Sequence, residues 1–522
     1  MTVDSAAPTV RRGAGARAGR YRATHKVAVG ALTALMAAGY SVFSLTLNRA
    51  FQTSTFDLVI FDQAVRSYAR FQPGISIAKG LHSGFGPHFS LLGDHWSPIL
   101  ASLAPLYWIH DSPETLLVAQ AGLFALAIPP LWVFTRRAFG GGRKATAGAY
   151  LVSVAYALSW PIASAAAFDF HEVAFAPAAT AVALERLQAG RLRTALIALA
   201  ALLLVKEDMG LLVAGIGLYL VAARPKTVRR QRLVAVALVA AGVAGALVTT
   251  YILIPAFGGR AGYYWAYDEL GRNVPQAVAH VIAHPLSSLR LLITPRVKLD
   301  TMLWLLAPSC FLSLLSPISI AVVPLLLERM LATQFPNWWG TMYQYNAYLV
   351  IILACAAVDG AARLDRWATW ARQRSIPAEM PARARAGENT GAVALVSAAA
   401  ICAVAVCLVP RFALGPALHR SFYQQNALDK AAAAAVAAVP SGVTVEAANC
   451  LGPHLSGRDT DLLWNGSGGS PLYPPWVVAT VNGQQFNFRS VQEQEQRIAL
   501  LRRHGYKTVF ERDGFVVLHS PA

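Results

Sequence analysis

The chain has 522 residues, of which 55% are hydrophobic and only 14% are charged, and its mean hydropathy is +0.44. A soluble domain carries roughly 25% charged residues, so this composition excludes an ordinary soluble protein and predicts that lipid covers most of the surface. The net charge of +18 lies in short basic runs between apolar segments, which is typical of cytoplasmic membrane-protein loops and excludes a nucleic-acid-binding face.

The N-terminus, residues 1–26, is basic and precedes an apolar stretch from Val27 to about Leu47. That stretch is too long for the core of a signal peptide, and no cleavage site accompanies it. Because basic residues are retained on the cytoplasmic side of a membrane, the pattern predicts an anchored first span with a cytoplasmic N-terminus.

Eleven apolar segments are predicted to cross the bilayer, since a span needs about 20 apolar residues, with a range of about 17–25. Residues 97–110 are apolar but short, and Pro98 and Pro105 interrupt them. We expect an interfacial helix there, because an additional span would place every later basic run outside. The predicted spans are 27–47, 114–135, 145–163, 173–188, 194–205, 209–223, 233–255, 301–316, 318–331, 346–362 and 391–410.

The predicted fold class is mainly α: a polytopic transmembrane helical bundle with a small C-terminal α/β soluble domain. In the C-terminal segment helix and strand signals alternate, and Asp513-Gly514 is typical of a hairpin turn. Helices are predicted at 427–438 and 490–504 and strands at 443–446, 476–481, 506–510 and 515–518. The chain divides into a cytoplasmic tail (1–26), a transmembrane core (27–362) with a large first outside loop (48–96), a basic cytoplasmic linker (363–390), a last span (391–410) and an extracytoplasmic domain (411–522).

Ionisable residues gather at three consecutive outside turns, whereas the inside loops are basic. Such residues near membrane spans are costly to bury and are functional candidates by default. The first loop holds Asp57, Asp62, His82, His88, Asp94 and His95, the second Asp169, His171 and Glu172, and the third Lys206, Glu207 and Asp208.

The carboxylates and the lysine each allow a functional and a structural interpretation. Asp57 or Asp62 can act as a general base toward an acceptor hydroxyl, or can cap a helix or hydrogen-bond the loop. Their spacing of five residues does not place both on one helical face. Lys206 suits a phosphate, with snorkelling toward lipid headgroups as the alternative; the adjacent Glu207 and Asp208 favour the phosphate.

The remaining acids and histidines offer oxygen and imidazole ligands for a divalent metal such as Mg²⁺ or Mn²⁺. Alternatively, the histidines hydrogen-bond the carboxylates and brace the loops, since no spacing fixes a metal geometry. The metal interpretation concerns Asp94, His95, Asp169, His171 and Glu172, with Glu207 and Asp208 beside them. Aromatic residues of the later outside loops form an interfacial belt or stack on a sugar ring.

Four sequence strings in the same order resemble the DUF2079 family of bacterial membrane proteins. They are FDLVIFDQ (56–63), HFSLLGDHWSPILASLAPLYWI (88–109), FDFHEVAFAP (168–177) and VKEDMG (205–210). The resemblance covers about residues 27–360, and the C-terminal segment is similar to the soluble end of those proteins. That family is in turn similar in layout to the GT-C glycosyltransferases, polytopic enzymes that use lipid-linked sugars.

The resemblance also implies roles for individual residues. Asp62-Gln63-Ala64 is similar to the Asp-Glu-Ala of the protein-mannosyltransferase and aminoarabinose-transferase group, with glutamine in place of glutamate. It implies Asp62 as the base, with Asp57 as its competitor, and Asp169 as a second acidic partner.

The donor phosphate contacts are implied in the same way. Lys206 matches the Thr-Lys after that group's fifth span, with Val205 in place of threonine, and implies a contact to the polyprenyl phosphate. The stretch beginning at His95 occupies the place of a His-Pro-Pro stretch and implies a second contact at the donor phosphate.

The predicted function is therefore a glycosyltransferase of the bacterial plasma membrane. It would transfer a sugar from a polyprenyl-phosphate donor to a cell-envelope acceptor on the outer face. The alternative is a non-enzymatic polytopic protein: a transporter or flippase of envelope lipids, or a scaffold. A transporter more often shows inverted repeats and broken helices near the midplane, whereas this sequence has no internal repeat and places its charges at span ends, which favours the enzyme.

Overall fold

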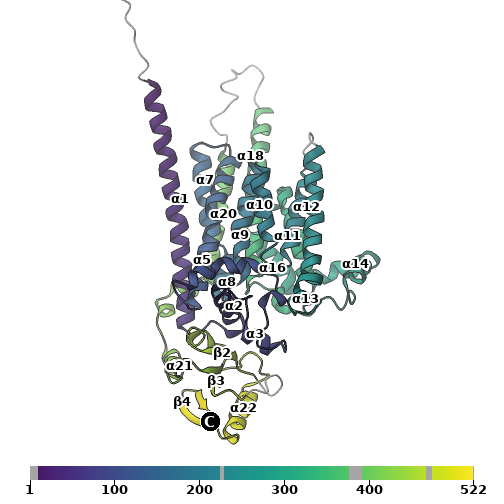
Figure 1. The fold of residues 1–522 in the computed structure, drawn as a ribbon. Coiled ribbons are helices and arrows are strands. Elements are labelled where there is room, and N and C mark those ends of the chain that lie inside the picture. The colour runs from purple at the N-terminus through teal and green to yellow at the C-terminus, as the bar shows by residue number, and fades with distance from the viewer. Residues whose placement is uncertain (1–9, 224–228, 375–390, 466–472, 521–522) are drawn as a thin grey trace, which may run out of the picture.

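The computed structural model describes residues 10–223, 229–374, 391–465 and 473–520. The chain forms a helical bundle with a small α/β domain at one end, and the N-terminal end of α1 lies at the opposite end (Figure 1). The principal helices of the bundle are α1 (Val10–Arg49), α5 (Glu114–Ala125), α6 (Ile128–Ala138), α7 (Gly142–Ala157), α8 (Trp160–Ala167), α9 (Phe175–Gln188), α10 (Leu192–Leu202), α11 (Met209–Ala222), α12 (Arg229–Val248), α18 (Ala347–Arg374) and α20 (Ala392–Leu408).

Within the described residues, 6 helices are long and apolar enough to cross a membrane. Each of them coincides with a predicted span. The other predicted spans correspond to shorter or interrupted helices, so the expected total of eleven is not confirmed. The long apolar helices cover Ala23–Arg49, Glu114–Ala138, Gly142–Ala167, Gln231–Ala256, Gln344–Arg374 and Ala392–Arg411.

The predicted tight pair of spans at 301–316 and 318–331 departs most from regular helix. The helix α16 (Arg296–Leu306) ends early, several 3₁₀ turns follow, and α17 (Val323–Leu331) begins only after them. Cys310 and Phe311 adopt left-handed backbone conformations with φ of 49° and 59°. L-residues in that conformation do not continue a right-handed helix, which explains the break.

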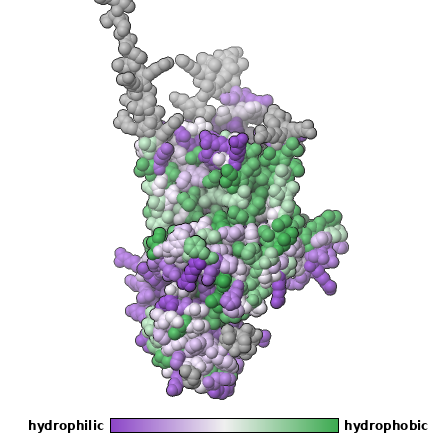
Figure 2. All heavy atoms as spheres, viewed as in Figure 1, coloured by the Kyte–Doolittle hydropathy of each residue, from purple (hydrophilic) through white to green (hydrophobic). Residues whose placement is uncertain are grey.

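Apolar side chains form a belt around the bundle, with polar residues at both of its ends (Figure 2). Large apolar side chains are exposed on this belt, among them Leu35 of α1, Val236 of α12 and Val396 of α20. A soluble monomer rarely exposes so extended an apolar surface. The belt is the surface expected of a multi-pass membrane protein.

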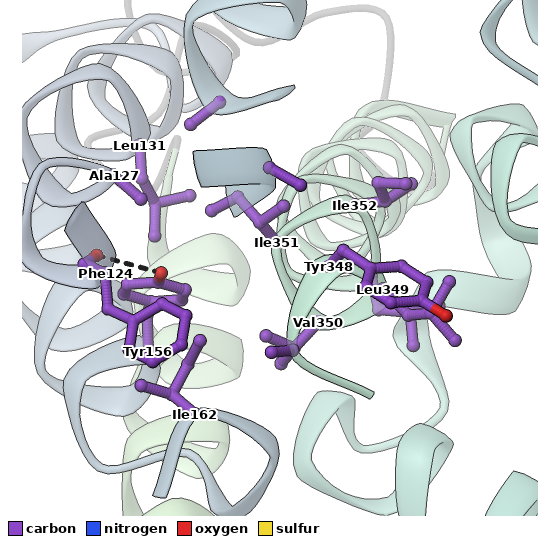
Figure 3. Close-up of a cluster of buried hydrophobic side chains, with 14 of the residues drawn as sticks. Phe124, Ala127, Leu131, Tyr156, Ile162, Tyr348, Leu349, Val350, Ile351 and Ile352 are labelled. Atoms are coloured by element: carbon purple, nitrogen blue, oxygen red, sulfur yellow. Dashed lines mark hydrogen bonds between the residues drawn. The ribbon is translucent and has the colours of Figure 1, made fainter. Parts of the chain in front are cut away.

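The core of the bundle surrounds α18. Ile351 and Val350 of this helix belong to one buried cluster with side chains of α5 to α8, and the Tyr156 hydroxyl donates to the Phe124 carbonyl at 3.0 Å (Figure 3). The helices α11 and α12 approach most closely where glycines face each other, because a Cβ at Gly210 would collide with the Gly242 carbonyl oxygen. Small residues allow such close packing in membrane helices.

The C-terminal domain holds a five-stranded sheet of order β2-β1-β3-β5-β4. β1 pairs in parallel with β2 and β3, while β5 pairs antiparallel with β3 and β4. Every predicted helix and strand of this segment is present, but β2 was not predicted. The elements are α21 (Ala427–Ala437), β1 (Thr444–Ala447), β2 (Thr460–Leu463), β3 (Trp476–Thr480), α22 (Val491–Arg503), β4 (Lys507–Arg512) and β5 (Phe515–His519).

This domain is joined to the loop of residues 48–96 by backbone and side-chain hydrogen bonds. The Asn449 carbonyl accepts from the Thr55 N–H at 2.7 Å, and the Asn449 side chain accepts from the Phe56 N–H at 2.9 Å. The Asp461 carbonyl on β2 accepts from the Gln63 side chain at 2.8 Å. The unpredicted strand is therefore part of the contact that fixes the first loop.

Gly452 makes this contact possible, because a Cβ there would collide with the Thr55 hydroxyl and the Asp461 carboxylate. We expect Gly452→Ala to weaken the docking by about 1–3 kcal/mol, the usual cost of overpacking. Limited trypsin digestion in detergent should then release the C-terminal domain faster. Gly457→Ala is the matched control, since its Cβ would lie 3.5 Å from the Asp111 carbonyl. Equal digestion rates for the two variants would contradict the docking geometry.

Candidate functional site

One continuous helical segment carries both candidate bases. It consists of η1 (Thr55–Val59), a π-helical turn, followed by α2 (Ile60–Ala69), and the Ser54 hydroxyl starts it by accepting from the Asp57 N–H at 3.3 Å. The side chain of Asp57 is 24% exposed, whereas that of Asp62 is 0% exposed. The two carboxylates therefore have different surroundings, as their spacing predicted.

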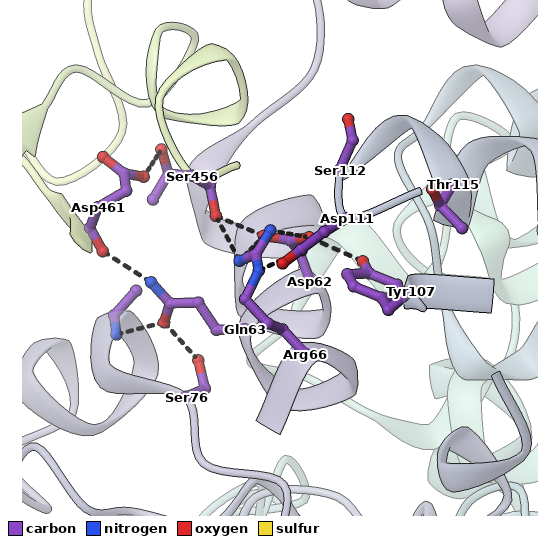
Figure 4. A network of polar contacts seen from close by, with 12 residues as sticks. Asp62, Gln63, Arg66, Ser76, Tyr107, Asp111, Ser112, Thr115, Ser456 and Asp461 are labelled. Carbon is purple, nitrogen blue, oxygen red and sulfur yellow. Dashed lines mark hydrogen bonds and ion pairs between the residues drawn. The ribbon is translucent and has the colours of Figure 1, made fainter. Parts of the chain in front are cut away.

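Asp62 is surrounded by a donor from its own helix and donors from two distant segments (Figure 4). Arg66 contacts its two oxygens at 2.7 and 3.0 Å, and the hydroxyls of Tyr107 (2.7 Å) and Ser456 also donate to it. Burial raises the pKa of Asp62, although Arg66, Ser456 and Tyr107 favour its charged form. Both oxygens are occupied, and the carboxylate joins the first loop to the C-terminal domain.

Asp57 lies in a second acidic group, together with Asp169 and His171. The Asp57 carboxylate is 3.3 Å from Nε2 of His171. Asp169 accepts from the Ser54 backbone N–H at 3.1 Å and from the Ser54 hydroxyl at 2.5 Å. Burial, reinforced by the charge of Asp57, raises the pKa of Asp169 to about 7. Gln120 fixes this turn, because its amide donates to the Asp169 carbonyl and accepts from the His171 N–H.

Lys206 lies beside this group, in the turn after α10. Its ammonium is 3.7 Å from Glu172 and 3.9 Å from Asp208. Both distances exceed a hydrogen bond, so these ion pairs leave the ammonium available for a closer anion. Burial opposes its charge, but Asp208 and Glu172 hold the pKa of Lys206 well above its usual value.

His95 and Asp94 form a third group. Nδ1 of His95 is 2.7 Å from Glu207, and Asp94 is 3.0 Å from Lys79 of α3 (Ile77–His82). Tyr264 donates to Asp94 at 2.8 Å and stacks on His95. Burial disfavours the charge of Glu207, but His95 lowers the pKa of Glu207 to about 2. This group joins the loop of residues 48–96 to the turn after α10.

A cavity of about 560 Å³ opens beside Lys206. Five predicted site residues line it, namely Asp94, His95, Lys206, Glu207 and Asp208. Aromatic residues that include Tyr264, Trp265 and Tyr345 form one side, and apolar residues of α11, α12, α17 and α14 (Val274–Ala283) form the rest.

Tyr345 connects the cavity with the Asp57 group. Its ring centroid is 5.9 Å from the Lys206 ammonium. Its hydroxyl lies close enough to Lys206 and Asp57 to feel their opposing charges. The structure therefore brings Asp57, Asp169, His171 and Glu172 into one group that adjoins Lys206 through Glu172, although none of the four lines the cavity. It places Asp62 in a separate network.

Arg329 is a buried cavity residue that the sequence analysis missed. Its guanidinium donates to the carbonyls of Trp338 (2.9 and 2.6 Å) and Tyr345 (2.7 Å) and to the Asn346 side chain (3.0 Å). These bonds hold the aromatic loop that presents Tyr345. The sequence could have indicated this residue, because Arg329 is the single arginine inside the apolar segment 318–331.

The predicted metal ligands do not converge. In the parts of the chain that the structure describes, no group of three or more His, Cys, Asp or Glu side chains is arranged to hold a metal ion. Asp94 is paired with Lys79, Glu207 with His95, and Glu172 and Asp208 with Lys206. The arrangement agrees with the interpretation in which histidines and carboxylates pair and brace the loops.

Comparisons with known proteins agree with this architecture. The family model DUF2079, described as a predicted membrane protein, matches residues 48–517. No curated protein matches the chain. The crystal structure of ArnT from Cupriavidus metallidurans bound to undecaprenyl phosphate is similar over 96% of this chain and 98% of that chain, with a TM-score of 0.53 and 13% identity. The likeness shows the fold and confirms the predicted GT-C-like layout.

The raised pKa of Asp169 gives stability a definite pH dependence. The folded pKa of about 7 exceeds the unfolded value of 3.8, so the unfolded chain loses this proton first and stability falls between about pH 4 and 7. We expect Asp169→Asn to remove this contribution, so that thermal unfolding in detergent at pH 5 and pH 8 differs less than for the unsubstituted protein. Asp513→Asn, in the exposed β4–β5 turn, is the control. If the unfolding temperature of Asp169→Asn differed between pH 5 and pH 8 as much as that of the unsubstituted protein, the raised pKa of Asp169 would be contradicted.

Proposed function

The chain belongs to the DUF2079 family of predicted membrane proteins, and we propose that it is a membrane glycosyltransferase with a polyprenyl-phosphate sugar as donor. The observation that carries the proposal is the cavity in which Lys206 lies between buried carboxylates and apolar walls. Such a donor combines a hydrocarbon chain, a phosphate at headgroup level and a sugar outside the membrane.

Each part of that donor has a counterpart in the cavity. The apolar sides of α11, α12, α14 and α17 suit the hydrocarbon chain. The Lys206 ammonium suits the phosphate, and Tyr264, Trp265 and Tyr345 offer rings for the sugar. The undecaprenyl phosphate bound to ArnT supports a lipid phosphate as the ligand of this fold.

We assign the general base to Asp57. A base needs a free oxygen within reach of the acceptor proton, and the oxygens of Asp62 are occupied by Arg66, Tyr107 and Ser456. Asp57 is partly exposed and belongs to the group next to Lys206. Asp62 then has a structural role, in place of the base role that the resemblance implied.

In the proposed reaction the acceptor hydroxyl attacks the anomeric carbon while Asp57 takes its proton. The bond from that carbon to the phosphate oxygen breaks, and the lipid phosphate leaves with the electron pair. Lys206 stabilises the charge that develops on the phosphate. Attack from the face opposite the leaving group inverts the anomeric configuration. The acceptor is a cell-envelope glycan, lipid or protein on the outer face of the plasma membrane.

Lys206→Gln tests the phosphate contact. A hydrogen bond to a charged group contributes about 1.5–3 kcal/mol, so we expect undecaprenyl phosphate to bind the purified protein roughly tenfold to a hundredfold more weakly, as measured by equilibrium binding in nanodiscs. Lys206→Arg should retain most of the affinity. Lys430→Gln, an exposed change on α21, controls for a general loss of charge. Unaltered affinity in Lys206→Gln would remove the phosphate assignment.

Asp57→Asn tests the base. Transfer of radiolabelled sugar from polyprenyl phosphate to an envelope fraction should fall by about 10²–10⁴-fold, the usual contribution of acid–base catalysis. Undecaprenyl phosphate should still bind, because Lys206 is unchanged. Asp62→Asn should instead release the C-terminal domain to trypsin. Wild-type transfer by Asp57→Asn would show that the base lies elsewhere, and donor binding without transfer by the unsubstituted protein would favour a transporter or scaffold.

A further inference from the structure

An arm of two short helices projects from the side of the bundle at α14 (Figure 1), and α14 lines the cavity. It consists of α14 and α15 (Pro285–Leu291), and α14 has no buried residue. Large apolar side chains are nevertheless exposed along it: Ile282 is 75%, Leu286 82% and Leu289 57% exposed. Exposure of this extent marks a surface that another apolar phase covers.

The exposed apolar residues follow helical stripes. Val274, Val278 and Ile282 recur every four residues along α14, and a second stripe follows on α15. The charge of the arm is one-sided, since no acidic residue lies between Glu269 and Asp300. Arg290 is its exposed cation on α15, and the exposed Arg272 and Arg296 flank the arm, Arg296 lying 3.6 Å from Asp300. Apolar stripes combined with arginines are typical of helices that lie in the interface of an anionic bilayer.

The position of the arm agrees with this pattern. Figure 2 shows the apolar belt of the bundle continuing onto the arm, with polar residues on the side toward the C-terminal domain. The base of the arm is fixed, because the buried Lys298 ammonium donates to the carbonyls of Leu291 (2.9 Å), Met330 (2.7 Å) and Ala332 (2.9 Å). The arm is therefore attached to the core at the level where the belt ends.

The apolar stripe of α14 also forms one wall of the Lys206 cavity. Val274, Val278 and Ile282 line it, with Leu211 of α11 and Leu247 of α12 among the other lining residues. The same side chains are exposed, so this wall is open at the edge of the bundle. A hydrocarbon chain entering between α14 and α12 would cover these side chains, which are exposed and also line the cavity.

We propose that the α14–α15 arm is a membrane-binding element that lies in the interface of an anionic bilayer and forms the lipid-side entrance of the cavity. The proposed binding of the arm to the bilayer interface rests on the arm's own residues and does not depend on the proposed function. The naming of a polyprenyl chain as the molecule that enters rests on the proposed function.

Spin-label accessibility, measured on the full-length protein in nanodiscs, tests whether the arm lies in the bilayer interface. Labels are placed at Leu286→Cys on the arm, at Leu35→Cys on the apolar belt and at Val509→Cys on β4, and the signal of the native cysteines is subtracted from the unsubstituted chain. We expect the Leu286 label to meet oxygen more than a water-soluble nickel complex, as Leu35 does. If the Leu286 label were as accessible to the nickel complex as the Val509 label, the proposed binding of the arm to the bilayer would be wrong.

The lipid charge is tested by comparing anionic phosphatidylglycerol nanodiscs with neutral phosphatidylcholine nanodiscs. We expect stronger protection of the Leu286 label from nickel in the anionic discs, and loss of that difference in Arg290→Gln/Arg296→Gln. Equal protection in both lipids before substitution would overturn the anionic preference.

Ile282→Glu tests the entrance. A carboxylate on this wall should weaken undecaprenyl phosphate binding by about tenfold or more, because a charge disfavours an apolar chain beside it. Val509→Glu is the matched control on the distant sheet. If Ile282→Glu left the affinity unchanged while Lys206→Gln still weakened binding, the proposed entrance would be wrong and the proposed function would stand. Unchanged affinity in Lys206→Gln would overturn the proposed function, while the label measurements would still decide the seat on the bilayer.

Discussion

The burial of the Asp62 carboxylate is the constraint on which the contact between the bundle and the C-terminal domain depends. A carboxylate out of contact with water must receive several hydrogen bonds or it destabilises the fold. Its donors come from α2 itself, from Tyr107 in the segment before α5 and from Ser456 in the C-terminal domain. Satisfying this one carboxylate therefore joins three segments, and the joined segments position the loop of residues 48–96.

The position of Asp57 follows from that arrangement. Asp57 and Asp62 lie on one helical segment, so anchoring the second carboxylate places the first beside His171. The two acids thereby have different surroundings, since both oxygens of Asp62 are bound and Asp57 remains partly exposed. The ion pairs of Lys206 are long, which agrees with the proposed exchange of one partner for a phosphate.

Hydropathy and charge runs predicted the long spans, because lipid imposes length and polarity on every segment that crosses it. The elements of the C-terminal domain were predictable for a similar reason, since the Asp513-Gly514 turn separates two apolar runs. The strand β2 was not predicted, because it is only four residues long and Asp461 interrupts its apolar run. The sequence left open whether Asp62 is a base or forms hydrogen bonds within the loop, because its partners Tyr107 and Ser456 lie far along the chain. Arg329 was missed because its carbonyl partners belong to an irregular loop whose path the sequence does not reveal.

The contact between Asp62 and Ser456 also has a consequence in time. The two residues are 394 positions apart. At roughly 5–20 residues per second of synthesis, Ser456 is made on the order of 20–80 seconds after Asp62. During that interval most of the bundle has already been inserted, but the outer helix lacks its last donor. The Asp62 network is thus completed only after the bundle has been synthesised, so a protein stalled before Ser456 would hold its buried carboxylate without one of its donors.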